Sequence, residues 1–305
     1  MTYWQPYFST IILLALKGFG RIYQKFEMKY KGIFPRLLLI GVLLGSCQAA
    51  PFVQEVSLEV NPTSIPVGLS ALEVATLDSL EKVDDYPLYT MVYKADYSHA
   101  GSTIAPRWEY STRAEWACSL FAAFGNPDQA LLGRNFDWDF SPGLLLYTDP
   151  DEGYASVSMV DLYYLGYGNE RAFGLTDLPL EELEGLLDAP FLPFDGMNEA
   201  GLAVGMAAVP DGGGPPDPQK ETIDSLLVIR KILDGAANID EAVAIIQTYN
   251  IDWGSGPAVH YLIAEESDRS ALVEFSNGEL VIQENQYSWQ VATNFLVSEA
   301  WGDPS

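Results

Sequence analysis

A single cysteine, Cys118, stands at the start of an apolar run, and polar residues follow it at short spacing. The run Cys118–Phe124 reads CSLFAAF, and the run Gly133–Trp138 reads GRNFDW. Arg134 therefore lies 16 positions after the cysteine, and Asp137 lies 19 positions after it. A thiol beside a cation or a base is a strong nucleophile. Taken singly, however, a lone buried cysteine is more often a small core residue, and an Arg–Asp pair across a turn is more often a structural ion pair.

Two asparagines further along the chain could assist such a nucleophile. Asn198 lies in Phe194–Val204, which reads FDGMNEAGLAV, and Asn294 lies in the run VATNF. Taken singly, the first is typical of a turn and the second of the end of a strand. A side-chain amide can also donate a hydrogen bond to an oxyanion, an interaction made only in the transition state. Both asparagines are therefore candidate site residues.

In this order and spacing, these motifs resemble the linear amide C–N hydrolases. That family comprises the choloylglycine (bile salt) hydrolases, the penicillin V acylases, and the group of N-acylethanolamine acid amidase and acid ceramidase. The resemblance runs from Cys118 to about Phe295, and GRNFDW at a fixed distance after a cysteine is its most specific motif. It implies an α+β fold, a four-layer αββα sandwich in which two antiparallel sheets lie between helices, as in N-terminal-nucleophile hydrolases.

The resemblance also implies a role for each matching residue. Cys118 is the expected nucleophile, exposed as a new N-terminus by autocatalytic cleavage after Ala117. Arg134 and Asp137 are expected to bracket it, with Asp137 holding Arg134 and binding the new ammonium group. The α-amino group, whose ordinary pKa is about 8, would serve as the base. The residues expected to surround the oxyanion are Asn198 and Asn294.

The composition excludes several other classes of protein. The 305 residues carry a formal charge of -26, and beyond residue 47 the chain holds 10 basic against 41 acidic residues. Such a surface repels phosphate backbones, so we expect no nucleic-acid partner. The two cysteines, Cys47 and Cys118, and the two histidines, His99 and His260, are too few for a paired-cysteine zinc site or a histidine-rich metal site. We expect no metal and no cofactor, and a small acyl amide as the substrate.

Residues 1–47 contain an upstream segment followed by a predicted export signal. A basic stretch, Met28–Arg36, precedes the apolar run Leu37–Leu44, which is too short to span a bilayer. The sequence that ends at Cys47, LGSC, is similar to a bacterial lipobox, in which the cysteine is acylated after cleavage. Ordinary cleavage near Ala49 is the alternative. We expect a cell-envelope lipoprotein or a secreted protein, with membrane contact only through the lipid anchor.

The rest of the chain divides at the nucleophile. Residues 48–117 carry no chemical signature and are expected to form a propeptide or an N-terminal segment. Residues 118–305 form the expected amide hydrolase domain. The resemblance implies a further functional arginine and closing strands after the Asn294 motif, but the chain ends eleven residues after Asn294, so we expect this domain to be incomplete at its C-terminus.

Hydrophobic periodicity agrees with the implied fold. Cys118–Phe124 and Ala130–Asn135 predict a hairpin, and Asn277-Gly278 predicts a two-residue hairpin turn. Helices are predicted over Thr222–Leu233 and from an N-cap at Asn238. The order of strands, a helix pair and strands, without βαβ alternation, favours antiparallel sheets covered by helices.

Two other functions fit parts of the sequence. Cys118, His260 and Asn294 occur in the order of a papain-like cysteine peptidase, but the local cysteine motif of that class is absent and His260 lies in the strand-like run VHYLIA. A lipid-anchored binding protein on the same scaffold, without catalysis, is the second alternative.

The substrate is predicted only as a class. The tyrosine-rich segment Tyr147–Tyr167 could form a hydrophobic acyl pocket or could pack a sheet face. We expect an amide that joins an apolar acyl group to a small polar amine, as in penicillin V, a conjugated bile acid or an N-acyl lipid amide.

Overall fold

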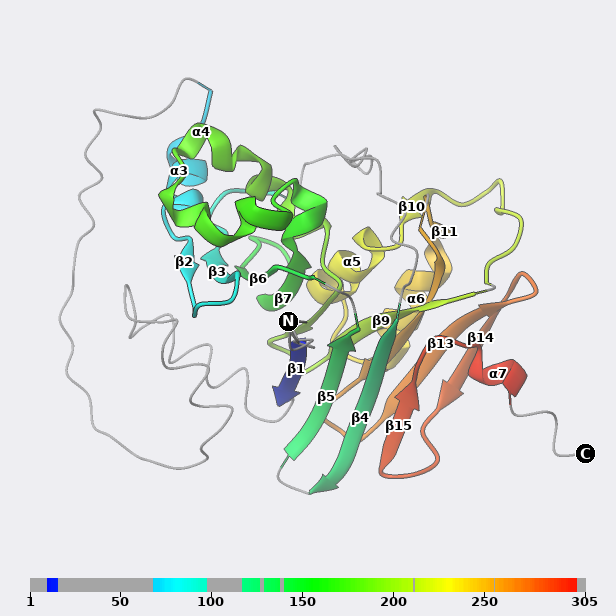
Figure 1. The fold of residues 1–305 in the computed structure, drawn as a ribbon. Helices are drawn as coiled ribbons and strands as arrows, with labels where there is room; N and C mark the ends of the chain where they lie inside the picture. The colour runs from blue at the N-terminus through cyan, green and yellow to red at the C-terminus, as the bar shows by residue number, and fades with distance from the viewer. Residues whose placement is uncertain are drawn as a thin grey trace, which may run out of the picture.

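The fold is built from two sheets that pack face to face, with helices over the larger one (Figure 1). The computed structural model describes residues 10–15, 68–97, 117–126, 129–137, 140–210, 212–254 and 256–300. The predicted signal and Cys47 lie outside the described residues, as does His99.

The smaller sheet carries the cysteine. Its strand order is β1-β5-β4-β15, and all its pairings are antiparallel. The predicted hairpin is present as β4 and β5, because the alternation of β4 turns Leu120, Ala122 and Phe124 toward the core. The strands are β1 (Thr10–Ala15), β4 (Cys118–Asn126), β5 (Gln129–Phe136) and β15 (Trp289–Ala292).

The larger sheet has the order β14-β13-β12-β9-β8-β7-β6-β3-β2, and it is antiparallel except where β3 runs parallel to β6. The predicted turn at Asn277-Gly278 joins β13 to β14 with φ values of 52° and 83°, the left-handed pair that a tight hairpin requires. The strands are β2 (Glu81–Lys82), β3 (Leu88–Val92), β6 (Gly143–Thr148), β7 (Ser156–Asp161), β8 (Asp195–Asn198), β9 (Ala203–Val209), β12 (Ala258–Ala264), β13 (Ser270–Ser276) and β14 (Glu279–Glu284).

The two sheets meet between β4–β5 and β9. A Cβ atom added to Gly205 of β9 would lie 2.8 Å from Leu120 and 3.6 Å from the side chain of Arg134. Glycine is therefore required at Gly205, because any larger residue would push the sheets apart. Arg134 is only 1 % exposed in this interface. The face of β4 that carries Cys118 is thus closed against the larger sheet.

Helices α5 (Leu227–Gly235) and α6 (Ile239–Thr248) cover the other face of the larger sheet, against β8, β9, β12 and β13. The second helix is capped by Asn238 as predicted, with the Glu241 amide donating to its side chain. The first helix begins later than predicted, because Thr222–Asp224 forms β10, which pairs with β11 (Asn250–Asp252). The start of that predicted helix was wrong.

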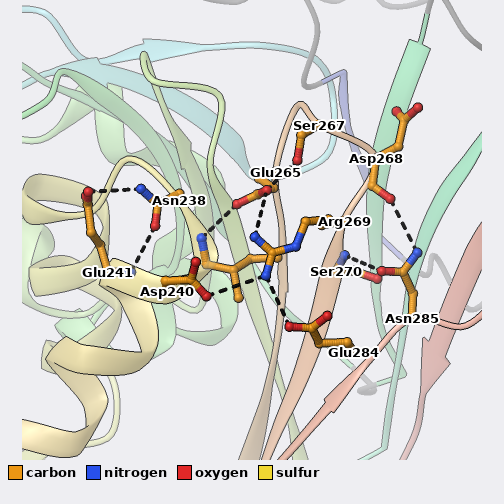
Figure 2. A network of polar contacts seen from close by, with 11 residues as sticks. Asn238, Asp240, Glu241, Glu265, Ser267, Asp268, Arg269, Ser270, Glu284 and Asn285 are labelled. Atoms are coloured by element: carbon orange, nitrogen blue, oxygen red, sulfur yellow. Dashed lines mark hydrogen bonds and ion pairs between the residues drawn. The ribbon is translucent and has the colours of Figure 1, made fainter.

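Arg269 ties α6 to the β12–β13 hairpin (Figure 2). Its guanidinium group lies 3.4 Å from Asp240 on the helix, 3.1 Å from Glu284 on β14 and 3.5 Å from Glu265. Glu265 also accepts the amide of Ile239 at 2.8 Å, within the first turn of α6. This network fixes the helix on the sheet at the end remote from Cys118.

Part of the predicted N-terminal segment belongs to the folded body. Tyr89 and Met91 of β3 are fully buried, and the strand pairs with β6 of the larger sheet. Helices α3 (Ala71–Leu77) and α4 (Leu180–Leu183) lie near β2 and β3 in Figure 1. They contact the short helix η3 (Glu184–Phe191), which is followed in the contact network by η1 (Leu162–Leu165) and η2 (Asn169–Asp177). In the part of the chain that the structure describes, no helix is long and apolar enough to span a membrane.

The expected fold class is confirmed: the chain is α+β, with two sheets packed as a sandwich and helices on an outer face. The larger sheet is not purely antiparallel, since β3–β6 is a parallel pair, and β10–β11 form a separate two-stranded parallel sheet. The last element is the short helix α7 (Val297–Ala300), which follows β15 and Asn294.

Candidate active site

Cys118 begins β4 with its backbone nitrogen turned away from β5. The amide of Asp137 donates to the carbonyl oxygen of Ala117 at 2.9 Å, and Cys118 stands opposite Phe136 in register. In an antiparallel ladder, such a residue points its own N–H to the other side. There the N–H of Cys118 donates to Oδ1 of Asn294 at 2.7 Å. The side chain of Cys118 is 3 % exposed and is a free thiol.

Asn294 is held on its other side as well. Its Nδ2 donates to the carbonyl oxygen of Ala208 at 2.7 Å, at the end of β9. Asn294 therefore lies beside Cys118, with its amide oxygen on the cysteine nitrogen and one of its two amide hydrogens on Ala208. This geometry holds the nitrogen of Cys118 and leaves the second amide hydrogen of Asn294 as a donor.

Arg134 brings a positive charge to the thiol. Its Nη2 lies 3.7 Å from Sγ of Cys118, and its Nε donates to the carbonyl oxygen of Met206 at 2.8 Å. The guanidinium carbon lies 3.5 Å from the ring centroid of Phe136 and 5.7 Å from that of Phe194. A buried guanidinium packed on two aromatic rings has little freedom to move. Arg134 therefore contacts the thiol, and its role in catalysis stays a prediction.

Asp195, rather than Asp137, is the carboxylate that pairs with Arg134. Oδ2 of Asp195 lies 3.3 Å from Nη1 of Arg134, and both side chains are buried. Burial raises the pKa of the Asp195 carboxyl group to about 6, and the attraction and hydrogen bond of Arg134 offset only part of that rise. The expectation that Asp137 holds Arg134 is contradicted by this geometry.

Asp137 lies beside the predicted cleavage site, with its side chain exposed. Its Oδ1 accepts a hydrogen bond from the side-chain amide of Asn135, and its backbone N–H is the group that donates to Ala117. The described contacts thus place the backbone of Asp137, and not its carboxylate, on the peptide group that precedes Cys118.

Asn198 lies on the opposite face of the larger sheet from Asp195. Its Nδ2 donates to the carbonyl oxygens of Leu233 at 3.0 Å and Ala236 at 2.7 Å, at the end of α5, and its Oδ1 accepts the amide of Leu202. These bonds use its amide to cap a helix and close a turn. The structure therefore does not bring Asn198 to Cys118, which contradicts its expected role at the oxyanion.

His260 does not complete a peptidase-like triad with Cys118. It is fully buried on β12, and its Nδ1 lies 3.0 Å from Oε1 of Glu274 on β13. Its Nε2 has no hydrogen-bond partner among the described residues. The described contact of the thiol is with the guanidinium of Arg134, and that of His260 is with Glu274, so these contacts do not form the cysteine–histidine pair of such a peptidase.

A small apolar pocket lies next to the rings that pack on Arg134. The ring of Phe194 lines it and is 5.6 Å from the ring of Phe136, the register partner of Cys118. Of the tyrosine-rich segment, Tyr164 lines the pocket, whereas Tyr167 is buried and donates to the carbonyl oxygen of Glu182. Other lining side chains are Met206, Leu226, Trp253 and Val259.

The described residues hold no group of three or more histidine, cysteine or acidic side chains that could bind a metal ion. The charged groups around the thiol are one guanidinium and one carboxylate. They suit nucleophilic chemistry by a cysteine.

Comparison with known proteins agrees with these features. Residues 193–301, which include Asp195 and Asn294, match the family model described as acyl-coenzyme A:6-aminopenicillanic acid acyl-transferase. This part of the chain, about a third of its length, is similar to that family. The acyl-transferase family match supports the resemblance to linear amide hydrolases that the motifs indicated. Comparison with curated proteins gave no match.

Among solved structures, the chain is similar to penicillin V acylase from Agrobacterium tumefaciens, with 19% identity, a TM-score of 0.31, and coverage of 58% of this chain and 45% of that one. It is also similar to two mutant forms of the conjugated bile acid hydrolase from Clostridium perfringens, with 14% and 16% identity and a TM-score of 0.34. Each of those comparisons covers 63% of this chain and 48% of the other. The chain thus spans about half the length of these solved structures.

Proposed function

We propose that this protein hydrolyses linear, non-peptide acyl amides with Cys118 as an N-terminal nucleophile. The observation that carries the proposal is the pair of contacts on this residue: Arg134 lies on its sulfur and Asn294 on its nitrogen. A cation beside the sulfur attracts negative charge that develops there during the reaction, and an acceptor beside the nitrogen orients the future amine. Both contacts come from side chains that the acyl-amide hydrolase motifs share.

Self-cleavage would expose the nucleophile. The sulfur of Cys118 attacks the carbonyl carbon of Ala117, the Ala117–Cys118 C–N bond breaks, and the acyl group moves from nitrogen to sulfur. Water then hydrolyses the thioester, which frees the carboxylate of Ala117 and the thiol. The amide of Asp137, which donates to the Ala117 oxygen at 2.9 Å, supports this step because that oxygen becomes negative when the sulfur adds.

The same sulfur would then act on substrate. The α-amino group of Cys118 takes the thiol proton, the thiolate adds to the amide carbonyl, and the C–N bond breaks as the amine leaves with that proton. Water completes the cycle by hydrolysing the thioester. Arg134 stays charged throughout and stabilises the sulfur anion, while Asp195 holds Arg134.

The apolar residues beside Phe194 would face the acyl group of the substrate, although the cavity there, about 20 Å³, would have to widen to admit it. Its aromatic and aliphatic lining suits an apolar acyl chain or ring, in keeping with the substrate class predicted from the sequence. Transfer of the acyl group to an acceptor other than water is the alternative outcome of the same thioester.

The test is a panel of chromogenic acyl amides, with apolar and polar acyl groups on one amine, assayed with the wild-type protein and with Cys118→Ala. We expect turnover of apolar acyl amides by the wild type alone, after processing to a fragment that begins at Cys118. Turnover by the Cys118→Ala variant, or cleavage of peptides with no amide of the panel hydrolysed, would refute the proposal. A folded protein that binds these amides without turnover would identify the inactive binding protein.

Export is part of the proposal. If Cys47 is acylated, Cys47→Ser should move the protein from the membrane fraction to the soluble fraction. An unchanged distribution would favour ordinary signal cleavage.

A further inference from the structure

Glu274 is the most completely bonded carboxylate that the structure describes near the site. It is fully buried on β13, and each of its oxygens accepts two hydrogen bonds. Oε1 accepts from His260 at 3.0 Å and from the amide of Val297 at 2.8 Å. Oε2 accepts from the side chain of Gln283 at 2.9 Å and from the amide of Ser298 at 2.8 Å.

Two of these donors belong to the segment that carries Asn294. Val297 and Ser298 open the short helix α7, and their amides have no partner within that helix because they lie in its first turn. Glu274 supplies the missing acceptors from a different strand. The segment from Asn294 to Ser298 is therefore fixed at both ends: Asn294 binds Cys118 and Ala208, and the first turn of α7 binds Glu274.

The carboxylate is held as an anion by this arrangement. Burial raises the pKa of Glu274, but the hydrogen bonds from His260, Ser298 and Val297 outweigh it and lower the pKa to about 2. His260 is the titratable group that faces the carboxylate, and Gln283 beside it is neutral. The anchor therefore persists at any pH at which the enzyme would work.

We propose that Glu274 is a positioning residue for the reaction: it holds the Asn294 segment so that the oxygen of Asn294 stays on the nitrogen of Cys118. His260 is then a structural partner of this anchor, which explains a buried histidine near a cysteine site that it does not touch. The proposal rests on the proposed function for its consequence in catalysis, but its structural part can be measured without any substrate.

The direct test is amide hydrogen exchange at position 118 in the Cys118→Ala background, in which the peptide bond stays intact. That amide has Asn294 as its partner, so its exchange rate reports this one hydrogen bond. Glu274→Gln replaces one acceptor oxygen by a donor. Val297→Pro removes one amide that binds Glu274, at a first-turn position where proline is tolerated.

We expect both variants to speed exchange at position 118 by about tenfold, with little change at the amide of Leu120 in the same strand. Val297→Ala keeps the amide and should behave as the parent. Ser276→Ala, which removes the bonds of Ser276 Oγ with Glu299 of α7 and with Asn277 but none to Glu274, should do so too. Unchanged exchange at position 118 in folded Glu274→Gln and Val297→Pro proteins would overturn the proposal. If Glu274→Gln does not fold, Val297→Pro gives the result alone.

A double-mutant cycle tests the catalytic consequence in the processed wild-type background. If Glu274 acts through Asn294, the losses in kcat caused by Glu274→Gln and Asn294→Ala should not add, while KM stays nearly constant. Additive losses would mean that Glu274 acts in some other way. A wild-type protein without turnover would refute the proposed function. Hydrogen exchange at position 118 would then decide by itself whether Glu274 holds the Asn294 segment.

Discussion

The backbone nitrogen of Cys118 and the side-chain oxygen of Asn294 lie 2.7 Å apart, and this bond takes the place of a ladder bond that the first residue of β4 lacks. The sulfur of the same residue lies 3.7 Å from Arg134. The nucleophile is thus held at two atoms, by Arg134 of β5 and by Asn294 in the segment that follows β15. Holding both atoms fixes the direction in which the sulfur can attack.

Replacing Asn294 should impair catalysis more than substrate binding. We expect Asn294→Ala to lower kcat by about tenfold to a hundredfold with KM nearly unchanged, because it releases the nucleophile and not the substrate. Asn294→Asp keeps an acceptor and adds a charge, which favours the ammonium form and should move the rising limb of the pH–rate profile to higher pH. Steady-state kinetics as a function of pH would measure both effects. A pure rise in KM would instead assign Asn294 to the substrate.

Asp195 should make stability depend on pH in a direction set by burial. Its pKa is about 6 in the folded chain against an ordinary value of 3.8, so its contribution to stability is full below pH 3.8 and is lost as the pH rises through 6. Between about pH 4 and pH 7, the wild type should lose of the order of 3 kcal/mol of unfolding free energy relative to Asp195→Asn. Urea denaturation of both proteins across this range measures the difference, and parallel curves would contradict it.

The same variant should be a poor enzyme. At neutral pH, Asp195→Asn removes the counter-charge of Arg134, so we expect kcat to fall although the variant gains stability relative to the wild type as the pH rises. We therefore expect the buried carboxylate of Asp195 to increase kcat and to lower the free energy of unfolding at neutral pH. Asp195→Glu is the matched control, because it retains the carboxylate charge but changes the distance from that charge to Arg134.

For Asn198 we expect the opposite result, a loss of stability without a loss of activity. Asn198→Ala leaves the carbonyl oxygens of Leu233 and Ala236 without their donor, so it should cost about 2 kcal/mol of stability. The folded variant should retain the kcat and KM of the wild type. Asn238→Ala, at the N-cap of α6, is a control of similar kind. A large fall in kcat with unchanged stability would return Asn198 to the catalytic residues.

Local patterns in the sequence predicted the hairpin that joins Cys118 to Arg134, because alternation and a turn cluster are signals carried within twenty residues. The partner of Arg134 could not be found in this way, since Asp195 belongs to the other sheet and the contact depends on how the sheets pack. One signal was available: Asp195 and Asn198 are three positions apart on a strand, so they face opposite sides. Only one of them could have faced Cys118.

The predicted helix start at Thr222 was wrong for a similar reason. The apolar residues of this segment have a helical period, but Thr222–Asp224 pair with Asn250–Asp252 as a parallel strand, a contact between segments far apart in the chain. Hydrophobic periodicity does not report such a pairing.

The final prediction concerns the fate of the segment ahead of Cys118. If the chain is cut after Ala117, residues 71–92 should stay bound to the larger fragment, because β3 pairs with β6 and buries Tyr89 and Met91 completely. Tyr89 also donates a hydrogen bond to the carbonyl oxygen of Ala172 at 2.7 Å. Burial of two such side chains alone stabilises the contact by about 3 to 6 kcal/mol, before the strand pairing is counted.

The two fragments should therefore elute together in size-exclusion chromatography and separate only in denaturant, with intact masses that divide at Cys118. Met91→Asp places a charge in the buried contact and should release the smaller fragment, whereas Val92→Asp, at an exposed position of the same strand, should not. A larger fragment that stays folded and soluble after the smaller one has dissociated in native buffer would show that the segment is a removable propeptide, and the expectation of a permanent two-fragment protein would be wrong.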